Sequence, residues 1–324
     1  MPNARLEIYP FQGRKLVINS TEEEPEINPE LSQFIEEQWN PSYSSAWMPH
    51  LRKLKFTPEK VFLEAGVMSY KQTAGMLKAI EQEKPFAPKL GGVNNLSLSI
   101  IPITSDNHAV LTRRSLNVSH APGVWNFPGG YMASHFISGG FKGCDDPKYK
   151  YDWRLFDPQW QLRRRAHNQE FHGLEEDDIS FEEKPVALAW GFLHSQEPEI
   201  AYVARLKKTA EQMKGHIRSF EVEKGKSEHS RVDFVPITQL ETLLANQGDL
   251  LSADPRTYET DDPTKIILLD DNIGELIGGG YSRLTGKAVP IGVADYLNNK
   301  GWDIRTFVNL SIHRTEVYLF PTSF

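Results

Sequence analysis

The chain has 324 residues, with 36 Lys and Arg against 43 Asp and Glu, and its formal net charge is −7. This balance excludes a general positive field of the kind that holds nucleic acid, and the length exceeds that of one typical compact domain. The single cysteine, Cys144, excludes an intramolecular disulfide and a multi-cysteine zinc site. Neither a secretory signal nor an apolar run of the roughly 20 residues in a membrane span is found, so we expect a cytoplasmic protein without membrane contact.

The first 90 residues are expected to form an N-terminal α+β subdomain. Leu6–Tyr9 and Lys15–Asn19 alternate between apolar and polar residues, which predicts a hairpin with its turn at Gln12-Gly13. Further along, the pattern predicts helices at Pro29–Trp39, Ser45–Leu54 and Gln72–Glu83 and a strand at Val61–Val67.

A central domain is expected over residues 91–250, followed by a C-terminal helical extension over residues 251–324. The expected strands are Leu96–Ile103, Ala109–Arg113, Ala187–Leu193, Ile200–Leu206 and Arg231–Pro236. Helices are expected at Gln159–His172, Thr238–Asn246 and Thr264–Ile277, and a final strand at Phe307–Phe320. The segment between Tyr131 and Gln159 is predicted to be a long loop, of the kind that is often functional or mobile.

The most informative run is Ala121-Pro-Gly-Val-Trp-Asn-Phe-Pro-Gly-Gly-Tyr131. It follows two predicted strands and the basic pair Arg113-Arg114, and a charged helix closed by Gly173-Leu174 comes after it. This arrangement resembles the Nudix hydrolase superfamily, whose members cleave nucleoside diphosphates linked to another group. The resemblance implies an α/β (α+β) fold, a Nudix mixed-sheet α/β/α sandwich.

Scattered similarity narrows the resemblance to the larger eukaryotic Nudix proteins that hydrolyse UDP-glucose and UDP-galactose. Gly66-Val-Met-Ser-Tyr-Lys71 is similar to a "GLTSYR" turn in their N-terminal extension, and Arg113-Arg-Ser is similar to their "RRS". Pro263-Thr-Lys-Ile-Ile-Leu-Leu269 looks like the start of a helix that follows their domain. The resemblance thus favours a nucleotide sugar as the substrate.

The family pattern, G-x5-E-x7-R-E-U-x-E-E-x-G-U (U, apolar), supplies carboxylates for divalent metal ions from one face of a helix. Its first and last glycines match Gly130 and Gly173 in this chain, with a long insertion between them. Counting back from the last glycine assigns the arginine position to Ala166 and the three glutamates of the helix to His167, Glu170 and Phe171. The glutamate six residues after the first glycine corresponds to Phe136. One carboxylate of the helix set therefore remains.

Glu170 is the first candidate catalytic residue and metal ligand because the pattern fixes its position. His167 lies one helical turn earlier and is the second candidate ligand for Mg²⁺ or Mn²⁺. The resemblance makes Glu228, in a loop before the strand at residue 231, the second candidate catalytic residue. The alternatives are a solvated polar helix face for Glu170 and His167 and a charged loop tip for Glu228. The loop acids Asp145, Asp146, Asp152 and Asp157 match no ligand spacing, so we expect them to be solvated.

Substrate binding is assigned to Arg113, Arg114, Gly129 and Gly130. An arginine at the strand end can pair bidentately with a diphosphate, although a strand-edge cation is the alternative. The two glycines allow a sharp turn with positive φ. Trp125 and Phe127, in the same run, are expected to pack against the turn and not to stack on a base.

The predicted function is metal-dependent hydrolysis by a Nudix-type pyrophosphatase acting on a small nucleotide substrate. The alternative is a catalytically inactive protein of the same fold that binds a nucleotide or a protein partner. Both hypotheses stay open, because the turn is intact while most of the helix carboxylates are missing.

Overall fold

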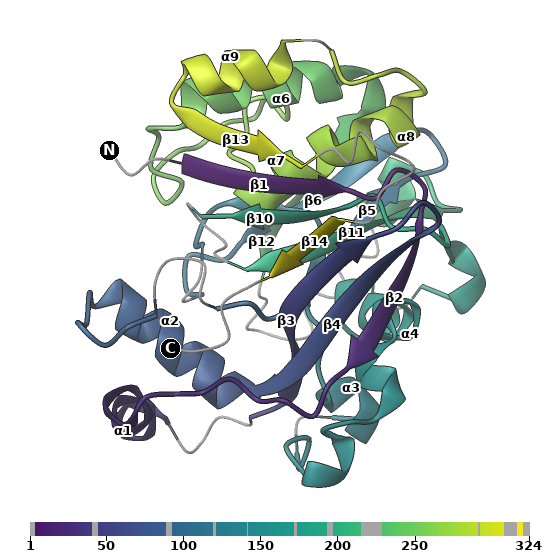
Figure 1. Ribbon diagram of the computed structural model, residues 1–324. Coiled ribbons are helices and arrows are strands. Elements are labelled where there is room, and N and C mark those ends of the chain that lie inside the picture. The colour runs from purple at the N-terminus through teal and green to yellow at the C-terminus, as the bar shows by residue number, and fades with distance from the viewer. Residues whose placement is uncertain are drawn as a thin grey trace.

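The structure is a computed structural model that describes residues 4–40, 45–88, 93–118, 121–140, 142–171, 174–192, 197–214, 229–290, 292–307 and 316–319. This part of the chain forms two β-sheets with helices around them (Figure 1). No helix within these ranges is long and apolar enough to cross a membrane. The α/β class predicted from the sequence is confirmed.

The larger sheet has ten strands in the described part of the chain. They are β1 (Ala4–Pro10), β5 (Ser97–Ile103), β6 (His108–Arg114), β7 (Trp125–Asn126), β8 (Gly129–Tyr131), β9 (Ile179–Phe181), β10 (Ala187–Gly191), β11 (Pro198–Leu206), β12 (His229–Pro236) and β13 (Trp302–Thr306). The main path is β12-β6-β5-β11-β10-β1-β13, and β7, β8 and β9 pair with β6, β5 and β11. The sheet is mixed, because β1 and β13, and likewise β5 and β11, run parallel.

A smaller sheet packs beside it in the order β14-β3-β4-β2 (Figure 1). Its strands are β2 (Lys15–Ser20), β3 (Trp47–Phe56), β4 (Lys60–Ser69) and β14 (Glu316–Leu319). Among these strands only β2 and β4 run parallel.

The helices are short. They are α1 (Pro29–Gln38), α2 (Tyr70–Glu81), α3 (His135–Ser138), α4 (Pro158–Arg165), α6 (Leu240–Leu250), α7 (Asp270–Glu275), α8 (Tyr281–Thr285) and α9 (Val293–Asn299). Single turns of other helix types are η1 (Pro147–Tyr149), η2 (Trp153–Phe156), η3 (Ala166–Glu170), η4 (Glu176–Asp178), η5 (Ile237–Gln239) and η6 (Leu276–Gly280).

Two apolar cores enclose the larger sheet. One face packs against α6, α7, α8 and α9, which lie together above β1 and β13 in Figure 1. The other face packs against α4 and the smaller sheet. Along β11, Ile200 and Tyr202 enter the second core while Ala201 and Val203 enter the first, so the strand is buried on both faces. The expected sandwich therefore has a sheet as well as a helix on one side.

Most elements predicted in the central domain are confirmed. β5 and β6 pair antiparallel through Ile103 and Ala109. The helix predicted beside them is present as α4 and η3, with Leu162 and Ala166 fully buried in the core that contains β5. β10, β11, β12 and α6 also lie where they were expected.

The helix expected over Ser45–Leu54 is wrong, because this segment belongs to strand β3. Pro49 lacks the backbone N–H that the interior of a helix needs. A strand tolerates a proline where no neighbouring strand needs that N–H, and Pro49 lies outside Lys53–Phe56, the part of β3 that pairs with β14. Leu54 and Phe56 alternate into the core with Lys53 and Lys55 between them, and this period of two suits a strand.

The predicted N-terminal hairpin is also wrong. Gln12 and Gly13 do form a turn with positive φ angles of 51° and 75°. The chain then crosses from one sheet to the other, since β1 pairs with β10 and β13 while β2 pairs with β4. With β1 in the larger sheet and β14 in the smaller one, the two sheets do not follow the expected divisions at residues 90 and 250.

Three C-terminal and loop predictions are corrected in extent. The helix expected from Thr264 begins only at Asp270, because the residues before it run extended beside β7, where Trp125 N–H donates to the Ile267 carbonyl at 2.8 Å. The long loop between Tyr131 and Gln159 contains α3, η1 and η2. The strand expected over 307–320 is present only as β14, and residues 308–315 and 320 lie outside the described ranges.

Candidate functional site

The glycine turn, by which we mean the run Phe127-Pro-Gly-Gly130, connects the short strands β7 and β8 in the middle of the larger sheet. β7 pairs with β6 through Trp125, and β8 pairs with β5 through Gly129 and Tyr131. A Cβ atom at Gly129 would lie 2.4 Å from the Leu98 carbonyl oxygen, so the close approach of these strands requires glycine. Trp125 and Phe127 are 4% and 1% exposed and pack in the core, as predicted.

Arg165, at the end of α4, ties the helix to this turn. Its guanidinium donates to the carbonyl oxygens of Gly129 at 2.9 Å and Tyr131 at 2.7 Å. Gly130 between them has a φ of 142°, and a Cβ atom there would lie 2.8 Å from Arg165 Nη1. Arg165 thus occupies the space that any side chain at position 130 would need.

Glu170 reaches the turn through the same arginine. Its Oε1 lies 3.3 Å from Arg165 Nη1, and the two side chains are 4% and 8% exposed respectively. The structure therefore brings Glu170, Gly129 and Gly130 together. The roles of Glu170 in catalysis and metal binding stay predictions.

Arg165 was not among the site residues predicted from the sequence, and the helix changes its winding at this point. Counting back from Gly173 gives Ala166 the arginine position of the pattern. In the structure α4 continues into η3, a π-helical turn, in which Phe171 N–H donates to the Ala166 carbonyl at 2.7 Å. A π-helical turn holds about one residue more than an α-helical turn. Arg165 lies one position before the counted arginine position, and Ala166, at that position, is buried in the core.

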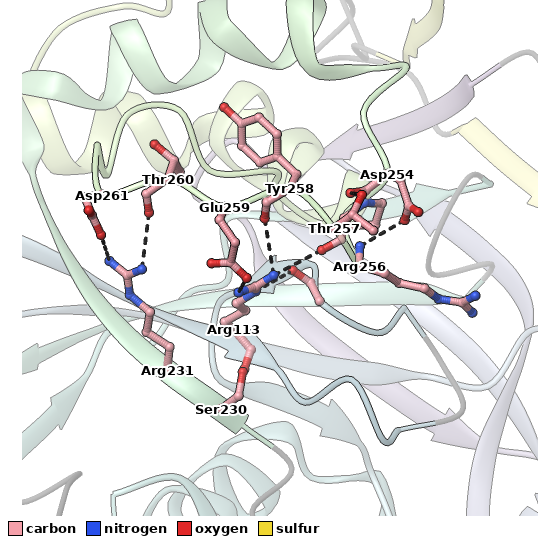
Figure 2. Close-up of polar contacts among 12 residues, drawn as sticks. Arg113, Ser230, Arg231, Asp254, Arg256, Thr257, Tyr258, Glu259, Thr260 and Asp261 are labelled. Atoms are coloured by element: carbon pink, nitrogen blue, oxygen red, sulfur yellow. Dashed lines mark hydrogen bonds and ion pairs between the residues drawn. The ribbon is translucent and has the colours of Figure 1, made fainter.

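Arg113 is buried and anchors the loop that follows α6 (Figure 2). Its Nη1 lies 2.6 Å from Glu259 Oε1, and its Nη2 donates to the carbonyl oxygens of Pro255 and Tyr258 at 3.2 and 3.3 Å. Its Nε donates to the Gly123 carbonyl at 3.1 Å. A diphosphate bound by Arg113, as predicted, would have to replace these contacts.

Arg231 on the neighbouring strand β12 holds the same loop (Figure 2). It donates to the Thr260 carbonyl at 3.2 Å and lies 3.7 Å from Asp261. Arg114, by contrast, lies on the opposite face of β6 from Arg113, because side chains alternate along a strand. Burial raises the pKa of both Tyr131 and Glu197, and the charge of Arg114 offsets a small part of this rise. The two arginines that were predicted to bind substrate together therefore act at different places. Arg113 binds the loop after α6, and Arg114 lies on the side of the glycine turn.

A group of buried acids beside the turn was not predicted. Burial raises the pKa of Glu197 to about 8 and that of Glu199 to about 7, and it raises the pKa of Glu275 well above its usual value. The Tyr131 hydroxyl donates to Glu197. The available signal was Glu197-Pro-Glu199, which places two carboxylates on one face of a strand. Glu275, their third member, comes from α7.

Asn272 on α7 connects these acids to the turn. Its Oδ1 accepts from Phe127 N–H at 2.8 Å, and its Nδ2 donates to Glu275 at 3.0 Å and to Glu199 at 3.3 Å. The side chains of Asn272, Glu275 and Glu199 are all buried. Perturbed carboxyl groups next to a backbone turn are a common feature of functional sites, although structural networks show them as well.

Among the residues whose side chains are described, no group of three or more His, Cys, Asp and Glu is placed to hold a metal ion. His167 is half-buried in the π-helical turn with Glu170. Glu228 lies outside the described residues, so its predicted place beside the turn stays a prediction. The described donors do not by themselves form a complete ligand set for Mg²⁺ or Mn²⁺.

Three of the four acids in the insertion begin short helices. Asp146, Asp152 and Asp157 accept from the backbone N–H groups of residues 148, 154 and 160 at the starts of η1, η2 and α4. Asp145 is exposed. These carboxylates cap helix ends and do not restore the missing acids of the pattern.

No protein-family model matches the chain, and no curated protein matches it. Among solved structures, the chain is similar to a Nudix hydrolase from M. Smegmatis, RenU, at 15% sequence identity. The match covers 45% of this chain and 71% of that chain, with a TM-score of 0.21. A likeness this low does not assign the chain to a family.

Proposed function

We propose that the protein is a Nudix-type hydrolase that cleaves the diphosphate of a nucleoside diphosphate-linked compound, with a nucleotide sugar as the first candidate. The supporting observation is the contact of Arg165 with Gly129, Tyr131 and Glu170. An arginine, a glycine turn and a helix carboxylate are the parts that the sequence pattern combines. We assign the arginine of the pattern to Arg165, one residue before the position obtained by counting back from Gly173.

The residues around the turn suit a diphosphate. Gly129 and Gly130 let a ligand approach the backbone closely, and Arg114 brings positive charge to the Tyr131 side of the turn. Glu170 would be the helix carboxylate of the site. When bound, Mg²⁺ or Mn²⁺ would neutralise charge on the diphosphate, and Mg²⁺ commonly combines one or two carboxylates with substrate phosphates.

A non-catalytic protein that binds a nucleotide or a protein partner is the second candidate. The observation that favours it is the position of the Glu170 carboxylate, which is 4% exposed and already paired with Arg165. A carboxylate held this way is less available to an ion, and each lost ligand weakens a metal site steeply.

Turnover of UDP-glucose separates the two candidates. We expect release of a nucleoside monophosphate only with added Mg²⁺ or Mn²⁺, with Mn²⁺ the better ion if His167 is a ligand. Glu170→Gln should lower turnover by about 100-fold, equivalent to about 2.7 kcal/mol of barrier, because the charge is lost while size is kept. The matched control is Glu176→Gln on exposed η4, which should keep the wild-type rate.

Two outcomes would contradict the hydrolase. One is Glu170→Gln with wild-type turnover, which would place any activity elsewhere. The other is a folded wild-type protein that turns over no nucleotide sugar, dinucleotide or capped nucleotide with either ion. Binding of one of these compounds without turnover would support the second candidate.

A further inference from the structure

A second polar feature lies where the chain passes from one sheet to the other. A cleft of about 510 Å³ is lined by the β1–β2 turn, by the β3–β4 turn and by Lys184 before β10. Its lining residues are Gln12, Gly13, Arg14, Lys15, Pro58, Glu59, Lys60 and Lys184. None of them belongs to the glycine turn, α4 or α7, so this cleft is a separate place on the molecule.

Arg14 is the unusual member of this set. Its residue is 5% exposed, yet it forms no ion pair within the described part of the chain. Its contacts there are a hydrogen bond from Nη1 to Gln12 at 2.9 Å and a position over the Phe56 ring, 5.9 Å from the centroid. Its Nε is buried and has no hydrogen-bond partner among the described residues. A buried charge without a counter-charge is costly, and buried cations are normally paired.

The rest of the cleft adds positive charge. The cleft has one acidic lining residue, Glu59, and four basic ones, Arg14, Lys15, Lys60 and Lys184. It is thus locally positive, although the net charge of the whole chain is −7. Lys15 pairs with Glu183 at 2.5 Å, but both side chains are more than half exposed, and such surface pairs contribute little. An added Cβ at Gly13 would meet nothing within 4 Å, so the space over the turn is open.

We propose that this cleft binds a small, multiply charged phosphate-bearing anion, with Arg14 as its buried counter-charge. A guanidinium pairs with phosphate oxygens through two parallel N–H donors, and the flexible lysines supply further positive charge around it. The volume falls within the range of small-molecule sites, of about 300 to 1,000 Å³, and suits a diphosphate or mononucleotide. The proposal concerns binding only and does not depend on the hydrolase.

Calorimetry with inorganic pyrophosphate, in low-salt buffer with EDTA, tests the site without a divalent ion. Wild-type protein should bind the probe, and Arg14→Met should weaken its affinity by at least about tenfold, because the buried counter-charge is lost. Lys60→Gln changes only an exposed residue and should weaken binding by about threefold. Arg256→Met removes the same charge at an exposed position that is not among the lining residues and should bind like wild type.

Thermal unfolding distinguishes a binding role of Arg14 from a packing role. Without the probe, Arg14→Met should be at least as stable as wild type, since it removes an unpaired buried charge. With pyrophosphate, the Tm of wild type should rise and that of Arg14→Met should not. No binding by wild type would overturn the proposal, as would equal binding by wild type and Arg14→Met. Loss of binding in Arg114→Met, which removes positive charge beside the glycine turn and leaves Arg14 in place, would locate the anion at that turn and would also overturn the proposal.

Discussion

Glu275 on α7 and Glu199 on β11 accept hydrogen bonds from the same side-chain amide, that of Asn272, in the interior of the protein. Ser99 donates to Glu275, and Asn272 donates to both acids. Burial raises the pKa of both carboxyl groups, that of Glu199 to about 7, and the neighbouring Glu199 charge adds to the rise at Glu275. The hydrogen bonds of Asn272 to Glu199 and to Phe127 N–H hold α7 to the larger sheet beside the glycine turn.

Stability should therefore fall as the pH rises. Glu197, Glu199 and Glu275 have pKa values raised above 4.5 by burial, so between that pH and about 8 the folded state binds more protons than the unfolded state. Their contribution is fully present below pH 4.5 and is lost as the pH passes through about 7 and 8. We expect urea unfolding to give a free energy lower by about 2 kcal/mol or more at pH 8 than at pH 5.

Glu275→Gln checks the cause of this pH dependence. The amide can donate to Glu199 but carries no titratable proton, so the difference between pH 5 and pH 8 should shrink by about half. An exposed acid serves as control, and Glu59→Gln should leave the pH dependence as it is in wild type. An unchanged slope in Glu275→Gln would remove this pair as its source.

Gly130→Ala should destabilise the protein by about 2 to 4 kcal/mol, because the new methyl group meets Arg165 at 2.8 Å and the φ of 142° disfavours alanine. Gly139→Ala is a matched control, with a φ of 79° and nothing within 4 Å of its Cβ, and should lose only about 1 kcal/mol. Denaturant unfolding of both variants measures the difference. Equal losses would show that Arg165 yields to the added methyl group without cost.

Arg113→Met should loosen the loop over residues 254–261. The carbonyl oxygens of Gly123, Pro255 and Tyr258 lose their donor, and we expect a loss of about 2 kcal/mol together with faster amide exchange across the loop. Arg231→Met, whose side chain is 36% exposed, should have a smaller effect. If Arg113→Met instead keeps the loop protected but loses nucleotide affinity, Arg113 is a diphosphate ligand, as the sequence predicted.

Asp157→Ala should cost about 1 kcal/mol, because the carboxylate accepts from Trp160 N–H at 3.1 Å at the start of α4. Asp145→Ala, at an exposed position without a capping bond to a described helix, should change stability by less than about 0.5 kcal/mol. Thermal unfolding of the two variants provides the comparison. Equal effects would argue against the capping role.

The central strands could be predicted because each is specified by residues that are neighbours in the sequence. β5, β6 and β11 are short apolar runs bounded by turn residues, and Gly129 and Gly130 mark a backbone position that excludes side chains. β3 was mistaken for a helix, since its apolar residues in a ten-residue window also fit helical spacing. The placement of β1 and β2 in different sheets could not be predicted, because the turn at Gln12-Gly13 is compatible both with a hairpin and with a crossing between two sheets.

The site was harder to predict than the sheet. Glu170 could be placed near Gly129 and Gly130 from the sequence because a glycine fixed its register, and its catalytic role stays a prediction. The contact of Arg165 with the turn could not be predicted, because one π-helical turn shifts the residues before it by one position. Glu197 and Glu199 are ordinary acids in sequence, and their character depends on Glu275, which comes from a distant helix. A carboxylate pair assembled across the fold leaves no local pattern to detect.

The pairing of β1 with β13 has a consequence for how the protein is made. β1 lies between β10 and β13, so one side of this early strand stays open until a segment near residue 302 has left the ribosome. In the same way, one side of β3 has no partner strand until β14 has been synthesised. Contacts so distant along the chain slow folding, and an unpaired edge is prone to join other chains. We therefore expect a nascent chain that ends before β13 to depend on chaperones more than the finished protein does.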